Sequence, residues 1–169
     1  MPDELQSFLN LWDREAEKTA SLIRSLPATQ YDFRPDPGAR SLGELAWHLA
    51  EVDAFMPFGI EQGVFSFTNR PPGIERPKTV EALAPGYERV HAEGAARVRK
   101  LTATDLDRKL RFVTGDELPI RDILWSAMLL HSIHHRGQLS VLCRMAGGVA
   151  PGVFGPNREE MAKLRARAS

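Results

Sequence analysis

Three of the five histidines have the spacing that a metal site requires. His131 and His135 are four residues apart in a segment of helical periodicity, so their rings lie on one face, within about 40° of each other. On a second predicted helix, His48 shares a stripe with Val52 and Phe55. A buried imidazole is unfavourable without a partner, and one shared ion would satisfy all three. We therefore predict that His48, His131 and His135 lie on the inner faces of their helices and bind a divalent metal.

The residues around these histidines limit the chemistry. The HExxH motif of zinc proteases needs a glutamate directly after its first histidine as a general base, and Ser132 stands there instead, so a protease of that type is excluded. The single Cys143 allows neither an internal disulfide nor a cysteine-rich zinc site. Three neutral imidazoles leave a coordination position open, as in catalytic sites. Zinc or nickel suits these ligands best, and iron or cobalt would also accept them.

Four polar residues near the predicted ligands are candidates for supporting roles. His134 lies to one side of the stripe, where we expect it to pack beside the ligands or support one rather than bind the ion. Gln138 is one turn beyond His135, and we expect a buried amide there to line the pocket. Glu44 and Glu51 could each orient the His48 ring or act as a general base. The favoured alternatives are a helix cap for Glu44 and a solvated helix edge for Glu51.

Two further charged or titratable residues are predicted to lie outside the site. Arg136 points about 140° away from His131 and should face outward, where it could hold the loop containing Phe154 or a neighbouring chain. His91 lies beside charged residues on a third predicted helix. We expect it to be solvated, with no partner that the pattern identifies.

The reverse face of the last long helix is also apolar. Trp125, Leu129 and Cys143 lie roughly 120° to 160° from His131, where a simple bundle helix would be polar. This second face predicts a homodimer. The alternative is that the first helix or the C-terminal segment covers it, and in either case Cys143 is a packing residue rather than a nucleophile.

The periodicity predicts an all-α protein in which facing helices position the histidines. The four long helices are expected at about 4–26, 41–59, 79–101 and 119–145. Ser41 and Glu44 form a capping box, Pro57 should kink or shorten the second helix, and Pro85 should kink or delay the third. Residues 60–78 are expected to form a long loop, and 108–113 an extended strand followed by a turn rather than a sheet. Asn157 should cap a short C-terminal helix.

Composition and charge favour an ordinary globular protein. The 169 residues suffice for one domain, which we expect to span 1–169, and the 22 basic and 22 acidic residues balance. This neutral balance does not support a nucleic-acid partner. The N-terminus lacks the pattern of a signal peptide and no apolar run could span a membrane, so a cytoplasmic protein is the simplest expectation.

Two segments resemble the DinB/YfiT-like family of metal-dependent enzymes. One is His-Ser-Ile-His-His-Arg-Gly-Gln at 131–138 together with the glycines and prolines of 147–156, and the other is Leu-Gly-Glu-Leu-Ala-Trp-His-Leu at 42–49. The resemblance covers nearly the whole chain in matching order. It implies a four-helix bundle with a long crossover loop and a metal triad at the positions of His48, His131 and His135.

The family resemblance also implies a class of reaction. The family is distantly similar to metal-dependent transferases that use low-molecular-weight thiols, so we expect a thiol S-transferase acting on electrophilic small molecules. An open metal position can bind a thiol and lower its pKa, which makes this chemistry plausible. The alternatives are a metal-dependent hydrolase that activates water, and a non-catalytic stress-response protein whose metal is structural.

Overall fold

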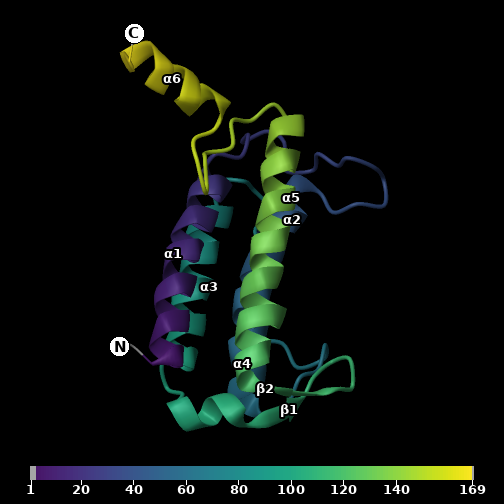
Figure 1. Cartoon of the computed structure of the whole chain (residues 1–169). Helices are drawn as coiled ribbons and strands as arrows, with labels where there is room; N and C mark the ends of the chain where they lie inside the picture. The colour runs from purple at the N-terminus through teal and green to yellow at the C-terminus, as the bar shows by residue number, and fades with distance from the viewer. Residues whose placement is uncertain (1–2, 169) are drawn as a thin grey trace.

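A computed structural model describes residues 3–168, and its long helices lie side by side in a bundle (Figure 1). The last of them is continuous over 120–145 and consists of three consecutive segments. The elements of the bundle are α1 (Glu4–Arg24), α2 (Leu42–Gln62), α3 (Leu83–Val98), α4 (Ile120–Asp122), η2 (Ile123–Leu130) and α5 (His131–Met145). Helices α2 and α3 run in the same direction, so the loop 63–82 must return along the bundle between them (Figure 1). The prediction of an all-α bundle with a long crossover is confirmed.

Local sequence signals account for where the second helix begins and ends. The Ser41 hydroxyl accepts from the Glu44 backbone N–H at 3.2 Å, and the Glu44 carboxylate accepts from the Ser41 N–H at 2.8 Å, which is the predicted capping box. The helix ends at Gly63, which has a left-handed backbone with φ of 68°. The prediction that Pro57 would end this helix early is wrong, because α2 continues to Gln62.

The packing of α2 on α3 explains how Pro57 is accommodated. Proline has no N–H, so the carbonyl of Asp53 lacks its helical partner. That carbonyl faces Gly94 of α3, where an added Cβ would lie only 2.5 Å from the oxygen. Because glycine has no side chain, α3 can approach this carbonyl closely. The two helices therefore contact each other where Pro57 leaves the carbonyl of Asp53 without its helical hydrogen bond. In α3 itself, Pro85 delays the start as predicted and lies in the first turn, where its missing N–H is not needed.

The last long helix is not uniform. Residues of η2 (Ile123–Leu130) have hydrogen bonds of the π type, with wider turns than an α-helix, and regular α-helix resumes at His131. A wider turn changes the angular relation between residues before and after it. Before the change, Leu124 and Met128 are buried in the core, whereas His131 is exposed and His135 is half-buried. The prediction that the histidines lie on a buried inner face is therefore corrected, because they border the core rather than enter it.

The connection from α3 to α4 contains a small sheet that the sequence interpretation did not expect. A short 3-10 helix η1 (Ala103–Asp107) precedes the strands β1 (Lys109–Arg111) and β2 (Glu117–Pro119), which pair antiparallel with Leu110 opposite Leu118. The turn between them contains Gly115 with φ of 93°. The extended segment was predicted correctly, but its pairing into a hairpin was not.

The second apolar face of the last helix is covered by α1. The Trp125 ring packs edge-on against Phe8 at 5.2 Å, and its indole N–H donates to Glu4 at 3.2 Å. Leu129 is buried in the same cluster, and Cys143 is fully buried beside Ser25 at the end of α1. The alternative of a covering first helix is therefore correct. A homodimer stays a prediction, without this face to support it.

Arg136 is buried, which corrects the prediction that it faces outward. Its guanidinium forms an ion pair with Glu15 of α1, and the two side chains are 3% and 5% exposed. It also donates to the Glu15 backbone carbonyl at 2.9 Å, and it lies 5.5 Å from the Phe154 ring, so the predicted contact with that loop is present. Arg136 does point away from His131, as the helical wheel predicts. The wheel describes one helix only, so it could not show that α1 packs against this side and buries the guanidinium.

The chain ends in α6 (Arg158–Ala168), which projects from the top of the bundle (Figure 1). Asn157 caps it as predicted, since its side-chain oxygen accepts from the Glu160 N–H at 2.7 Å. No residue of this helix is buried.

No helix among residues 3–168 is long and apolar enough to cross a membrane.

His91 has partners, contrary to the prediction that it is solvated. Its Nδ1 lies 2.9 Å from the buried carboxylate of Asp53, and its Nε2 lies 3.1 Å from Asp13. Asp53, which is 1% exposed, also accepts from the Trp12 indole and the Tyr87 hydroxyl. This network joins α1, α2 and α3. Burial by itself lowers the pKa of His91, but the hydrogen bonds and charges of Asp53 and Asp13 outweigh it, so the pKa is raised.

The raised pKa of His91 predicts how stability depends on pH. The folded state holds the proton more tightly than the unfolded chain, whose histidine has an ordinary pKa of 6.5. The stabilisation by His91 should be complete below that value and be lost as the pH rises through the folded pKa. We expect the free energy of unfolding of the wild type, minus that of His91→Gln, to be constant in acid and to fall at higher pH. Urea unfolding between about pH 5 and 9 measures it, and a flat difference would contradict the prediction.

Candidate metal centre

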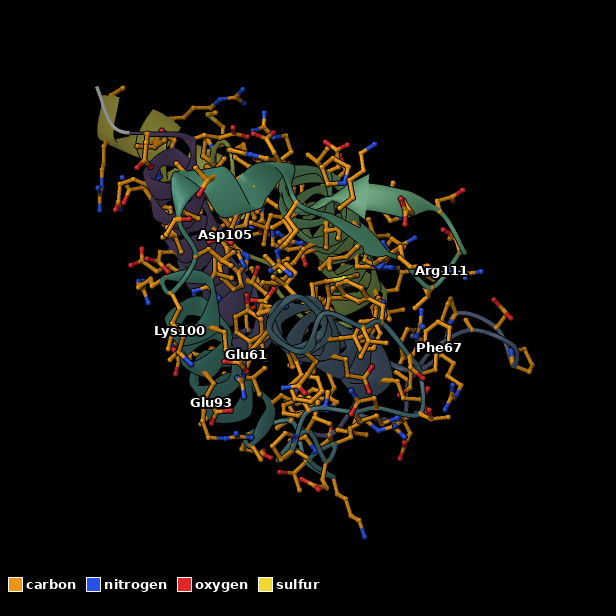
Figure 2. The ribbon with its side chains drawn as sticks, turned by 90° about the horizontal axis from the view of Figure 1, so that it is seen from below. Glu61, Phe67, Glu93, Lys100, Asp105 and Arg111 are labelled. Carbon is orange, nitrogen blue, oxygen red and sulfur yellow. The ribbon has the colours of Figure 1, made fainter. Side chains whose placement is uncertain are left out.

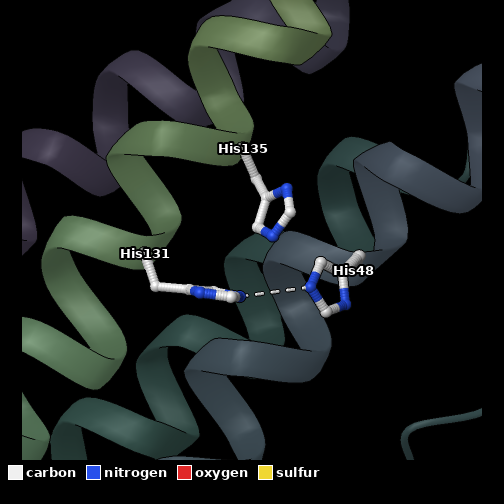
Figure 3. Close-up of side chains that lie close together, drawn as sticks. All are labelled: His48, His131 and His135. Atoms are coloured by element: carbon white, nitrogen blue, oxygen red, sulfur yellow. Dashed lines mark hydrogen bonds between the residues drawn. The ribbon is translucent and has the colours of Figure 1, made fainter.

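Three histidines from two helices converge on one point. His48 comes from α2, and His131 and His135 come from successive turns of α5 (Figure 3). Each offers one ring nitrogen, and the three nitrogens all lie within 4.8 Å of one another. The Nε2 atoms of His48 and His131 are 3.4 Å apart (Figure 3). The structure thus brings together the three residues that the sequence singled out, in an arrangement that could hold a metal ion.

The environment of His131 and His135 favours the uncharged form of these two rings. Burial lowers the pKa of His131, and the charges of His48, His134 and Arg40 lower it further. Burial also lowers the pKa of His135 to about 4 and outweighs the opposing hydrogen bond with Gln138, and the charges of the neighbouring histidines lower it further. A neutral imidazole keeps a lone pair available, so His131 and His135 remain ready to act as ligands at neutral pH.

Two neighbouring side chains orient the rings. The Glu51 carboxylate lies 3.4 Å from Nδ1 of His48, and the Gln138 side-chain oxygen lies 2.7 Å from Nδ1 of His135. A donor at Nδ1 leaves the Nε2 lone pair free for an ion, and this is the usual arrangement around histidine ligands. Gln138 also lies 3.0 Å from the ring of His134, which makes His134 a supporting residue outside the triad.

The predictions for these supporting residues had mixed outcomes. Glu44 is a helix cap, the favoured alternative, and it forms ion pairs with Arg34 and Arg76. Glu51 lies at a solvated edge, the favoured alternative, with its side chain 45% exposed, and it also contacts His48 as the other alternative predicts. Gln138 is exposed rather than buried, although it does contact a predicted ligand. Exposure was misjudged because the triad lies at the rim of the bundle.

A cavity of about 730 Å³ opens beside the triad. Its walls come from α2, the crossover loop, the β hairpin and the last long helix, and they include Phe55, Phe67 and Phe112. Figure 2 shows Phe67 on the side of the molecule where Arg111 of the hairpin lies, away from Glu93 and Lys100. The sequence analysis did not identify Phe67 and Phe112 as residues of the site. Loop residues have no regular periodicity, so their sequence does not indicate which helix they pack against.

The fold and the site together define the class of this protein. It is a helical bundle with a long crossover, in which one histidine of the second helix and two of the last long helix form a potential metal site. The sequence profile of the DinB superfamily matches residues 11–139, which include all three histidines. The chain belongs to the DinB superfamily. It is 30% identical over 164 residues to the uncharacterised protein YrdA of Bacillus subtilis (strain 168), a match that covers 95% of this chain and 93% of that protein.

Solved structures support the same assignment. A DinB-like protein from Bacillus cereus ATCC 10987 superposes with a TM-score of 0.72 at 29% identity, over 87% of this chain and 95% of the other. The mycothiol-dependent maleylpyruvate isomerase superposes with a TM-score of 0.56 at 12% identity, over 89% of this chain and 63% of the isomerase. The second likeness is one of fold.

Proposed function

We propose that this protein is a metal-dependent enzyme in which His48, His131 and His135 bind one divalent ion, zinc or nickel. The observation that carries the proposal is the convergence of three ring nitrogens within 4.8 Å at the edge of a cavity. Three protein ligands with space beside them are typical of catalytic sites, whereas structural zinc sites have four. Imidazole ligands suit zinc and nickel.

The reaction that we propose is S-transfer, in which the sulfur of a low-molecular-weight thiol loses its proton and forms a C–S bond to an electrophilic carbon of a small molecule, while the leaving group on that carbon departs with the proton. An ion bound by the triad would supply Lewis acidity, which lowers the pKa of a thiol at the open position. The fold likeness to a mycothiol-dependent enzyme supports a thiol as co-substrate. Cys143 is fully buried beside α1 and does not line the cavity, so the proposal gives the chain's own thiol no part in this reaction.

The chain's own residues prepare this site. Glu51 and Gln138 hold the Nδ1 sides of two rings, so the Nε2 sides face the same point. The aromatic and aliphatic walls of the cavity offer an apolar surface on which the body of a substrate can pack. The site thus combines a fixed set of ligands with an apolar space for a substrate.

The test of this proposal has a binding step and an activity step. Purified protein should contain about one divalent ion per chain by elemental analysis. The loaded protein should then consume a thiol in the presence of electrophiles, assayed with several thiols and a broad electrophile panel. Turnover of the panel without added thiol would point to a hydrolase instead. If metal binds and no thiol is consumed with any electrophile, transferase activity is refuted; if removal of metal only unfolds the protein, the ion is structural.

Removal of an orienting partner should weaken metal binding without abolishing it. We expect Glu51→Ala to lower zinc affinity by about 10- to 100-fold, because His48 loses the carboxylate that holds its ring and tautomer. Competition with a chromophoric chelator measures the affinity. Glu75→Ala, at an exposed position of the crossover loop, is the control and should change nothing. Equal affinities for the two variants would show that Glu51 has no orienting role.

A further inference from the structure

Two arginine side chains that line the cavity beside the triad have no ion-pair or hydrogen-bond partner among the described residues. Arg40 and Arg70 both line it, and among residues 3–168 neither side chain has an ion pair or hydrogen bond. Other arginines of the same loops behave differently, since Arg34 and Arg76 both pair with Glu44. The guanidinium groups of Arg40 and Arg70 therefore remain available to an anion from outside the chain.

The charge of the cavity is positive even before a metal is bound. Glu51 is the only acidic residue among those that line it, and it is directed at His48. Among the guanidinium and carboxylate groups of the lining, two arginines against one glutamate leave an excess of one positive charge. Arg40 lines the same cavity as His48, His131 and His135, so an anion paired with Arg40 would share that space with the triad.

Part of the cavity wall is aromatic. Phe55 and Phe67 stack with ring centres 6.0 Å apart and planes inclined by 10°. Phe67 is 72% exposed, although it belongs to a cluster that also includes Phe65 and Phe112. A volume of about 730 Å³ is typical of small-molecule sites, which combine apolar walls with a few polar groups. An apolar ligand would shield the exposed face of this stack from water.

We propose that the cavity selects a small organic acid, whose carboxylate pairs with Arg40 and Arg70 while its apolar or aromatic body packs on Phe55 and Phe67. The guanidinium fork matches a carboxylate geometrically, and the two arginines come from different loops that meet at the same cavity. This inference rests on the proposed function, because it names the class of electrophile that would reach the triad. The test below separates the two.

The experiment compares two probes of the same shape and different charge. Cinnamate and cinnamamide are titrated calorimetrically into metal-free protein, so that a carboxylate cannot bind through an ion. We expect cinnamate to bind about tenfold more tightly than cinnamamide, because only cinnamate can form charged hydrogen bonds with the arginines. The double variant Arg40→Gln/Arg70→Gln should bind both probes equally. Arg14→Gln, at an exposed position of α1 away from the cavity, should keep the preference.

The outcomes are distinct for each claim. Equal binding of the two probes by the wild type, a preference that survives in the double variant, or no binding of cinnamate at about 10 mM would each overturn the inference. Both arginines are exposed, so the double variant should retain the wild-type melting temperature and metal content, which are checked first. A preference for cinnamate in a protein that binds no metal would refute the proposed function and leave this inference standing.

Discussion

His131→Ala is expected to abolish stoichiometric metal binding. His131 supplies one of the three converging ring nitrogens. Alanine has no side-chain atom that can bind a metal, so the site would keep only two ligands. The loss should exceed the roughly 100-fold that removal of an outer hydrogen-bond partner can produce. Elemental analysis after dialysis against zinc, followed by chelator competition, measures the effect. His48→Ala and His135→Ala should behave alike, because each removes an equivalent ligand.

The matched control for this prediction is His134→Ala on the same helix. His134 contacts Gln138 and lies outside the converging group, so its removal should lower affinity by less than about tenfold. His131 is exposed, so its replacement should leave the metal-free fold intact, as circular dichroism can verify. If His131→Ala binds zinc as tightly as His134→Ala does, the triad is not the metal site.

Glu15→Gln is expected to produce a large loss of stability. The substitution removes the negative charge that neutralises the buried guanidinium of Arg136, while volume is preserved. An uncompensated buried charge is destabilising by about 3 to 5 kcal/mol. Lys18, which also pairs with Glu15, is half-buried and can turn to solvent, so the charge left uncompensated in the core is that of Arg136. Urea unfolding should show the loss, and the melting temperature should fall by about 10 °C.

Two variants make this prediction specific. Glu17→Gln on an exposed position of α1 removes the same charge and should change stability by less than about 0.5 kcal/mol. The double variant Glu15→Met/Arg136→Met replaces both ions by apolar groups and should recover most of the loss. A decrease for Glu15→Gln no greater than that for Glu17→Gln would mean that the pair is solvated in solution.

Much of the candidate site could be predicted from the sequence, because its signals are local. The i, i+4 spacing of His131 and His135 is enough to put two rings on one side of a helix. The capping box of Ser41 and Glu44 locates the helix that carries His48. The cost of burying three unpaired imidazoles then joined His48 to this pair, and the family resemblance implied the same triad. These inferences needed only neighbours within one or two turns, and backbone geometry determines such neighbours.

The remaining features depend on residues that are far apart in the chain. Arg136 finds its carboxylate 121 residues away, and His91 finds Asp53 and Asp13 at separations of 38 and 78 residues. A helical wheel gives the direction of a side chain, but only the tertiary structure says which element fills that direction. The wider turns of η2 also change which residues face the core before His131. The cavity depends on loop residues such as Arg40 and Arg70, which lack periodicity.

The triad shows this division most clearly. Residue type and spacing determined that His131 and His135 could act together on one ion, because an α-helix has a fixed period. Tertiary packing decided that His48 meets them, that the rings lie at the rim of the bundle rather than in its core, and that a positively charged cavity opens beside them. The physical reason is that the period is a property of the backbone, whereas burial and charge arise from whatever other segments of the chain pack nearby.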